Sequence, residues 1–166
     1  MIRASAKQLA SFDGTRLGYR VYGSRGPWLV LVNGLGSSYD CWELLLDSLA
    51  ERWRVLIWDL RGLYGSAIPV NRRRLTMADH CRDLEALLAA ERVSCAVVGG
   101  WSMGVQIALE AYRRLPEQVV GLVLINGTYG RFFSSCFHLP LPWLLLPPVL
   151  RLGHAGSPFV SRLVSG

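Results

Sequence analysis

Cysteine is scarce in this 166-residue sequence and is nowhere clustered. No two of its four cysteines lie close along the chain: Cys41, Cys81, Cys95 and Cys136. This spacing excludes a Cys-x-x-Cys metal pair and a dense disulfide framework, so no metal site is expected and reduced thiols fit best. Residues 1–12 also lack the apolar segment of a secretory signal and carry Arg3 and Lys7. We therefore expect a cytoplasmic protein.

A membrane-spanning helix is not predicted either. Residues 132–150 are uncharged and numerous enough to cross a bilayer. Each proline among them, however, would remove a helical hydrogen bond where no water can replace it: Pro140, Pro142, Pro147 and Pro148. We expect an apolar lid instead, which faces either the substrate or, as a peripheral contact, a membrane surface.

Acidic residues are a minority, with 12 Asp and Glu against 18 Lys and Arg and a formal charge of +6. The basic residues are spread mostly singly among apolar segments, and their one run, residues 72–74, has no aromatic residue interleaved with it. No nucleic-acid partner is therefore expected. The hydrophobic share of 51% is typical of a globular chain that folds around one core.

Strand patterns are plentiful, and they are of two kinds. Asp13 and Gly14 form a turn signal, and apolar residues then alternate from Leu17 to Val21, which predicts an antiparallel hairpin. Further along, the apolar runs are continuous, as expected for parallel strands that are buried on both faces. These runs begin at Trp28, Arg54, Cys95 and Gly121.

Helical patterns lie between the apolar runs. Two pairs indicate helix starts by their spacing, Asp40 with Glu43 and Thr76 with Asp79. Apolar stripes follow, with Trp42, Leu45, Leu46 and Leu49 after the first start and Met77, Leu84, Leu87 and Leu88 after the second. The predicted fold class is α/β, a mostly parallel sheet with an N-terminal antiparallel hairpin and helices on both faces.

The segment Gly100-Trp101-Ser102-Met103-Gly104 matches G-x-S-x-G where a strand should pass into a helix. A serine on such a sharp turn needs small residues two positions before and after it, because the chains pack closely there. The turn would expose the Ser102 hydroxyl and direct the Met103 amide, at the helix start, towards a developing oxyanion. The alternative is a glycine-rich turn with an incidental serine.

Together with this turn, three other segments resemble the α/β-hydrolase superfamily. "LVNGLGSSYDCW" is similar to the family's His-Gly segment, with Asn33 in the place of His and Leu35 where the second oxyanion amide comes from. "DLRGLYGS" resembles the D-x-R-G-x-G-x-S loop, in which we interpret Asp59 and Arg61 as structural. "LINGTYGR" resembles the strand end from which many members enter a cap.

The resemblance implies a hydrolase fold that is incomplete at its C-terminus. We expect residues 1–130 to form the N-terminal part of the core and residues 131–166 the start of an apolar, proline-rich cap. The family sheet would continue with about two more strands that carry the triad acid and histidine. Downstream of Ser102 the chain offers four candidates for these roles: Glu110, Glu117, His138 and His154. Only His154 has the glycine-flanked loop setting typical of a catalytic histidine, but no strand pattern leads into it, and a position in a cap or loop is favoured. The chain is therefore predicted to be truncated and to lack both groups.

The resemblance further implies a cofactor-free serine hydrolase that cleaves small apolar carboxylic esters through an acyl-enzyme on Ser102, with the Met103 and Leu35 amides as oxyanion donors. One alternative is a non-catalytic remnant that binds an apolar ligand or a partner. A nucleotide-binding module is disfavoured, because Tyr39 replaces the third glycine after Gly34 and Gly36. The last predicted strand, residues 121–126, would leave an apolar sheet edge through which the chain could associate with itself.

Overall fold

The structure is a computed structural model that describes residues 4–127 and residue 129. Three features predicted from the sequence lie outside these residues: the cap segment 131–166, His138 and His154. The domain boundary at residue 130 and the apolar lid therefore stay predictions. Within the described part of the chain, none of the helices combines the length and the apolar character needed to cross a membrane.

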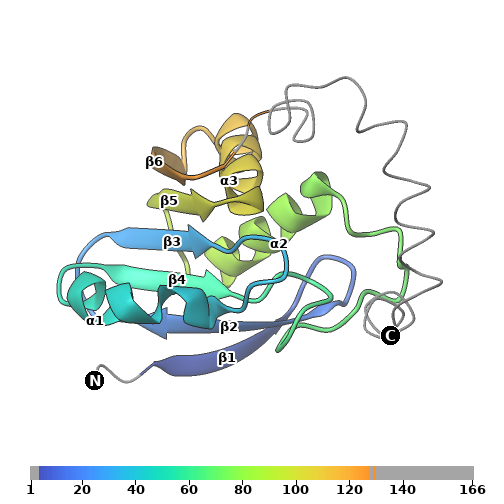
Figure 1. The fold of residues 1–166 in the computed structure, drawn as a ribbon, viewed down its shortest axis with the longest axis horizontal. Coiled ribbons are helices and arrows are strands. Elements are labelled where there is room, and N and C mark those ends of the chain that lie inside the picture. Colours follow the sequence, from blue (N-terminus) through green and yellow to red (C-terminus); the bar gives the residue numbers. More distant parts are fainter. Residues whose placement is uncertain (1–3, 128, 130–166) are drawn as a thin grey trace, which may run out of the picture. The chain divides into compact units, whose positions relative to one another are not determined.

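A six-stranded sheet forms the centre of the fold, with strand order β1-β2-β4-β3-β5-β6 (Figure 1). Its strands are β1 (Ser5–Ala10), β2 (Arg16–Tyr22), β3 (Trp28–Val32), β4 (Arg54–Trp58), β5 (Ala96–Trp101) and β6 (Val119–Ile125). β1 and β2 pair antiparallel, as do β2 and β4, whereas β4, β3, β5 and β6 run parallel. The predicted mostly parallel sheet with an N-terminal hairpin is thus confirmed.

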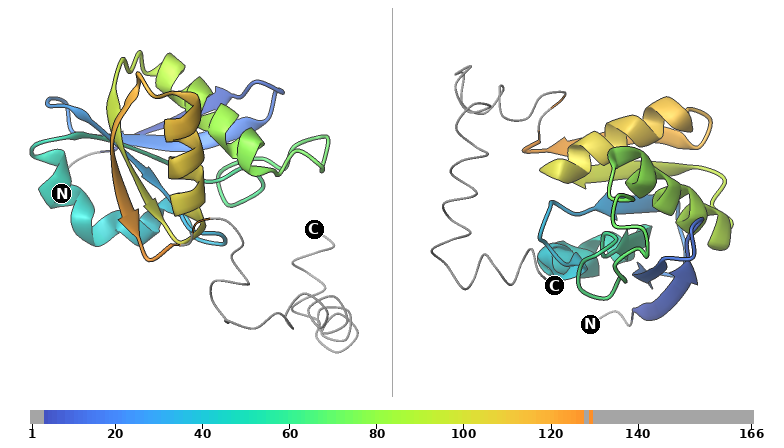
Figure 2. Two further views of the ribbon diagram at one scale, coloured as in Figure 1. Left: turned by 90° about the horizontal axis from the view of Figure 1, so that it is seen from above. Right: turned by 90° about the vertical axis from the view of Figure 1, so that its right-hand side faces the viewer.

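Helices cover both faces of this sheet. η1 (Tyr39–Trp42) and α1 (Glu43–Ala50) lie on one face, and α2 (Met77–Ala90) and α3 (Met103–Arg114) on the other (Figure 2). Strand β3 supplies both cores, because Val30 and Val32 face the α2 and α3 side while Leu29 and Leu31 face α1. All four side chains are buried. A strand that is buried on both faces must be apolar at every position, which explains the continuous run in the sequence.

The two predicted helix starts have different outcomes. The one at Thr76 is confirmed as a reciprocal capping box, in which Thr76 Oγ1 accepts from the Asp79 amide at 3.2 Å and Asp79 Oδ2 from the Thr76 amide at 3.1 Å. The helix start predicted from Asp40 and Glu43 is wrong. The chain enters a 3₁₀ turn there, and Ser38 caps it by accepting from the Asp40 amide at 3.2 Å.

The predicted stripe after that start is also partly wrong. Trp42 and Leu46 are buried as expected, but Leu45 is 51% exposed. Leu46 and Ala50 are four residues apart and occupy the inward face of the short helix α1, so a residue one position earlier points away from the sheet. The sequence pattern has more leucines here than the buried face can hold.

Candidate active site

Ser102 lies in the turn between the end of β5 and the start of α3. Its backbone has φ 55° and ψ −117°, a conformation that is strained for a residue with a side chain. Two backbone hydrogen bonds fix it: the Ser102 amide donates to Ile125 O at 3.1 Å, and Ser102 O accepts from the Val105 amide at 3.1 Å. Such strain persists only where the surroundings impose it, and it is concentrated at functional sites.

Glycines make this turn sterically feasible, as the sequence predicts. A Cβ on Gly100 would lie 2.2 Å from Gly104 O, and one on Gly104 would lie 2.3 Å from Val32 O. Sequence reasoning missed a third glycine of the same kind. A Cβ on Gly127 would lie 2.6 Å from Ser102 O and 2.2 Å from Val105 Cγ2. Its signal was a glycine directly after a predicted strand end, in "LINGTYGR".

The loop after β3 approaches the same serine. A Cβ on Gly34 would lie 3.2 Å from Ser102 Cβ and 3.1 Å from the Trp101 ring, so the two segments approach each other closely there. Leu35 follows directly, with a side chain that is 73% exposed. Met103 is the first residue of α3, where backbone amides have no acceptor within the helix. Met103 thus follows Ser102 in the chain, and Leu35 follows the glycine that approaches Ser102. The role of these two residues as oxyanion donors stays a prediction.

Asn33 anchors this loop with a fully buried side chain. Its Nδ2 donates to Trp58 O at 3.0 Å and to Ser37 O at 3.5 Å, while its Oδ1 accepts from Trp42 Nε1 at 2.7 Å. The thiol of Cys41 also approaches Oδ1, at 3.8 Å. The amide that stands in the place of a family histidine thus connects the end of β3 to β4 and to η1.

Among the described residues, no histidine or carboxylate is hydrogen bonded to the Ser102 hydroxyl. Glu110 is engaged elsewhere on α3, where its carboxylate accepts from Arg113 at 2.7 Å. This hydrogen bond lowers the pKa of Glu110. His80, on α2, is buried among the groups around Asp83, and burial lowers its pKa below 6.5. Neither residue is placed as a partner of the serine.

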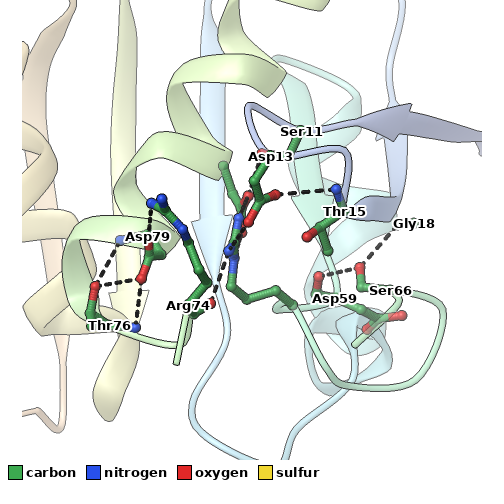
Figure 3. Close-up of polar contacts among 11 residues, drawn as sticks. Ser11, Asp13, Thr15, Gly18, Asp59, Ser66, Arg74, Thr76 and Asp79 are labelled. Carbon is green, nitrogen blue, oxygen red and sulfur yellow. Dashed lines mark hydrogen bonds and ion pairs between the residues drawn. The ribbon is translucent and has the colours of Figure 1, made fainter. Parts of the chain in front are cut away.

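Asp59 and Arg61 hold loops, in agreement with their structural interpretation. The Asp59 carboxylate accepts from the Tyr39 amide at 3.1 Å and from the Gly65 amide at 3.0 Å. Burial raises the pKa of Asp59, and these two hydrogen bonds oppose the rise. Ser66 continues the connection, since its hydroxyl donates to Asp59 O at 2.6 Å and accepts from the Gly18 amide at 3.0 Å (Figure 3).

Arg61 is the centre of a buried charged cluster. Its guanidinium donates to both carboxylate oxygens of Asp83, at 2.7 and 2.5 Å, and to Asp13 at 3.0 Å. It also donates to Arg74 O at 2.9 Å, and the Ser11 hydroxyl donates to Asp83 at 2.5 Å. The cluster connects the hairpin turn, the loop after β4 and helix α2 (Figure 3).

The described residues include one cavity, which lies away from Ser102, and no metal cluster. In residues 4–127 and 129, no group of three or more His, Cys, Asp or Glu side chains could hold a metal ion. A cavity of about 350 Å³ lies on the hairpin, and Ser102 does not line it. Its lining residues are Ala6, Lys7, Gln8, Gly18, Tyr19, Arg20, Tyr39 and Gly65.

Comparison with known proteins extends the resemblance. The family model described as alpha/beta hydrolase fold matches residues 27–154. A curated protein of Azorhizobium caulinodans, RutD, whose name provisionally assigns it to carbamate hydrolysis, is 30% identical over 124 residues, which cover 73% of this chain and 45% of that protein.

Solved structures show the same likeness. An epoxide hydrolase from an endophytic Streptomyces superposes with a TM-score of 0.71 at 27% identity, over 76% of this chain and 38% of that one. An enol-lactonase from Burkholderia xenovorans LB400 gives a TM-score of 0.65 at 28% identity, over 70% and 45% of the two chains. The sequence therefore spans less than half the length of each of these three proteins.

Proposed function

Since the chain belongs to the alpha/beta hydrolase fold family, we propose that Ser102 is the nucleophile of a serine hydrolase that cleaves carboxylic esters. The observation that carries the proposal is the conformation of Ser102. A serine with φ 55° stands on a turn that requires glycine at two flanking positions, with the loop after β3 packed against its Cβ. A strained strand-to-helix turn of this kind exposes the nucleophile of α/β-hydrolases at the carboxyl edge of their sheet, which supports the proposal.

In the proposed reaction, the Ser102 oxygen attacks the ester carbonyl and the alcohol leaves, so that an acyl-enzyme remains for water to hydrolyse. The amides of Met103 and Leu35 would donate hydrogen bonds to the oxyanion as it forms. The acid and the base of the triad are not among the described residues. The proposal therefore assigns this part of the chain the nucleophile and the oxyanion donors, and it requires no cofactor.

The names of the relatives favour a carbonyl substrate without selecting one. Carbamates and enol-lactones both carry a carbonyl carbon that a serine can attack, as an ester does. The name epoxide hydrolase denotes the hydrolysis of a different kind of bond, in an epoxide. Similarity of fold alone therefore does not determine which reaction this chain would catalyse. A small apolar ester is the substrate class that we propose.

A second candidate function, that of a non-catalytic binding protein, is supported by a separate observation. Ser102 has no hydrogen-bonded histidine or carboxylate in the described part of the chain, and without a base a serine is a weak nucleophile at neutral pH. This favours a non-catalytic protein that binds an apolar ligand or a partner with a hydrolase scaffold.

A fluorophosphonate probe separates the two candidates. If Ser102 is an activated nucleophile, the probe should label it, and Ser102→Ala should abolish labelling while Ser37→Ala and Ser66→Ala leave it intact. Labelling that persists in Ser102→Ala would show that the nucleophile assignment is wrong. If the folded wild-type chain shows no labelling and hydrolyses a short p-nitrophenyl ester no faster than Ser102→Ala, the non-catalytic candidate is favoured.

A further inference from the structure

The side chain of Asn33 is placed to control the loop that approaches Ser102. Asn33 follows the last residue of β3 and precedes Gly34, where an added Cβ would lie 3.2 Å from Ser102 Cβ. The backbone of Asn33 also lies close to the turn that carries Ser102, because a Cβ on Gly104 would lie 2.9 Å from Asn33 O. Any rotation of the Asn33 backbone would thus move Gly34 and Leu35 relative to the serine.

Both ends of the Asn33 amide are used, and by different elements. Nδ2 donates to the end of β4, at Trp58 O, and to the far side of its own loop, at Ser37 O. Oδ1 accepts from the indole of Trp42 in η1. A carboxamide can donate and accept in this way without carrying charge, whereas an ionised carboxylate can only accept. Asn33 is fully buried, so each unmade bond would leave a desolvated polar group.

The loop itself has a conformation that needs such an anchor. The Ser37 amide donates to Gly34 O at 3.2 Å, which closes a tight turn around Leu35 and Gly36. Gly36 has φ 78°, and nothing lies within 4 Å of a Cβ placed on it. The tip of the turn is held instead by a hydrogen bond, which the Tyr64 hydroxyl donates to Gly36 O at 2.5 Å. The hydrogen bond from Asn33 Nδ2 to Ser37 O directly joins the buried start of the loop to its exposed turn.

We propose that Asn33 is a positioning residue, whose buried amide sets the orientation of the Gly34–Leu35 peptide and hence the distance from the Leu35 amide to Ser102. Asn33 does not touch the substrate. The inference rests on the proposed function of Ser102. Since an amide does not titrate, the orientation is held at the same value across the whole pH range in which the chain is folded.

The test compares Asn33→Asp and Asn33→Leu with Asn71→Asp as the matched control. Asn71 is exposed and its side chain accepts from the Arg73 amide, so the same chemical change is made away from the site. The rate of fluorophosphonate labelling at Ser102 should fall about 10-fold or more in both Asn33 variants, a part of the roughly 100- to 1000-fold lost when an oxyanion donor is removed. Asn71→Asp should label at the wild-type rate.

A pH series distinguishes positioning from a general loss of structure. At low pH the carboxyl of Asn33→Asp becomes protonated and regains a donor, so its labelling rate relative to wild type should recover as pH falls, while Asn33→Leu should show no recovery. Circular dichroism must show all variants folded at each pH. Equal labelling of Asn33→Leu and wild type, or equal ratios at every pH, would overturn the proposal.

A second readout keeps the inference separate from the proposed function. If wild-type Ser102 is not labelled at all, the proposed function fails, and Asn33 is judged by NMR. The backbone amide signals of Gly34 and Leu35 should then shift in Asn33→Leu more than those of Val55 and Leu56 in β4, and unchanged signals would overturn the proposal. If both Asn33 variants fail to fold, Trp42→Phe takes their place in the same comparison, because it removes the indole donor to Oδ1 and keeps an aromatic ring, although a smaller one, in the core.

Discussion

Two buried polar clusters lie at the carboxyl edge of the sheet, and they are built from opposite chemistry. The charged cluster is centred on Arg61 and Asp83, whose side chains are both 0% exposed. The neutral cluster is centred on Asn33, which bonds to an indole and to backbone carbonyls. The charged one joins the hairpin turn, the loop after β4 and α2. The neutral one holds the loop after β3, which approaches Ser102.

The difference shows how stability and function are divided in this part of the chain. A buried ion pair is costly to desolvate and costly to break, so it fixes its loops firmly. Neutral hydrogen bonds contribute about 0.5–1.5 kcal/mol each, but they hold their geometry without responding to pH. A site that must keep one geometry is thus supported by the neutral cluster, and the strongest interactions are placed where they hold loops together.

Removing the centre of the charged cluster should have the largest effect. We expect Arg61→Leu to lower the free energy of unfolding by about 3–5 kcal/mol, because Asp83 is left buried without its partner. Urea denaturation measures this loss. The double variant Arg61→Leu with Asp83→Leu should recover part of it, since it removes the fully buried unpaired charge, and only the partly exposed Asp13 still lacks its partner. A single variant as stable as wild type would show that the pair does not fix these loops.

A methyl group added at Gly104, in the turn that carries Ser102, should destabilise the fold. Gly104→Ala would bring a Cβ to 2.3 Å from Val32 O, so we expect a loss of about 1–3 kcal/mol in the free energy of unfolding. Gly121→Ala is the matched control, because its Cβ would meet the Val97 side chain at ordinary contact distances, 3.4 Å to Cγ2 and 3.8 Å to Cγ1. Thermal melting of the two variants should separate them clearly. Equal melting temperatures would contradict the tight approach of α3 to β3.

The sequence predicted the parts of this arrangement that depend on neighbours along the chain. The hairpin turn, the continuous parallel strands and the Thr76 capping box each follow from residues within a few positions of one another. The neutral cluster could not be predicted in that way, since Asn33 bonds to Trp42 across 9 residues and to Trp58 across 25. Gly127 was missed for the same reason, because the need for a glycine arises from Val105 and Ser102 O on another element.

Low pH should lower the free energy of unfolding through His80, which lies near the charged cluster. Burial lowers the pKa of His80 from 6.5, against the Asp83 carboxylate, which raises it. Because the unfolded chain binds this proton more readily, the contribution of His80 to stability is complete above pH 6.5 and is lost as pH falls below it. Between pH 5 and 7, the urea midpoint should therefore depend less steeply on pH in His80→Gln than in wild type. Identical slopes would assign the pH dependence to other groups.

The smallest effect is expected where charges meet near the surface, at the junction of the hairpin and the end of α2. Glu91 accepts from Lys7 Nζ at 2.8 Å and from the Tyr19 hydroxyl at 2.7 Å, but the Lys7 side chain is 37% exposed. Water and salt screen such a pair, so Lys7→Met, which keeps most of the apolar stem, should lower the free energy of unfolding by about 0.2–1 kcal/mol.

Salt and pH show whether this outer pair differs in kind from the charged cluster. Burial raises the pKa of Glu91, but the hydrogen bonds from Lys7 and Tyr19 outweigh it and hold the pKa below 4.5. The contribution of Glu91 is therefore complete above pH 4.5 and is lost as pH falls through its lowered value. In 1 M salt the difference between wild type and Lys7→Met should shrink towards zero, whereas the Arg61→Leu difference should persist because that pair is shielded from ions. If the two differences respond equally to salt, burial does not separate the two kinds of interaction, and the contrast between the clusters would have to be explained by geometry alone.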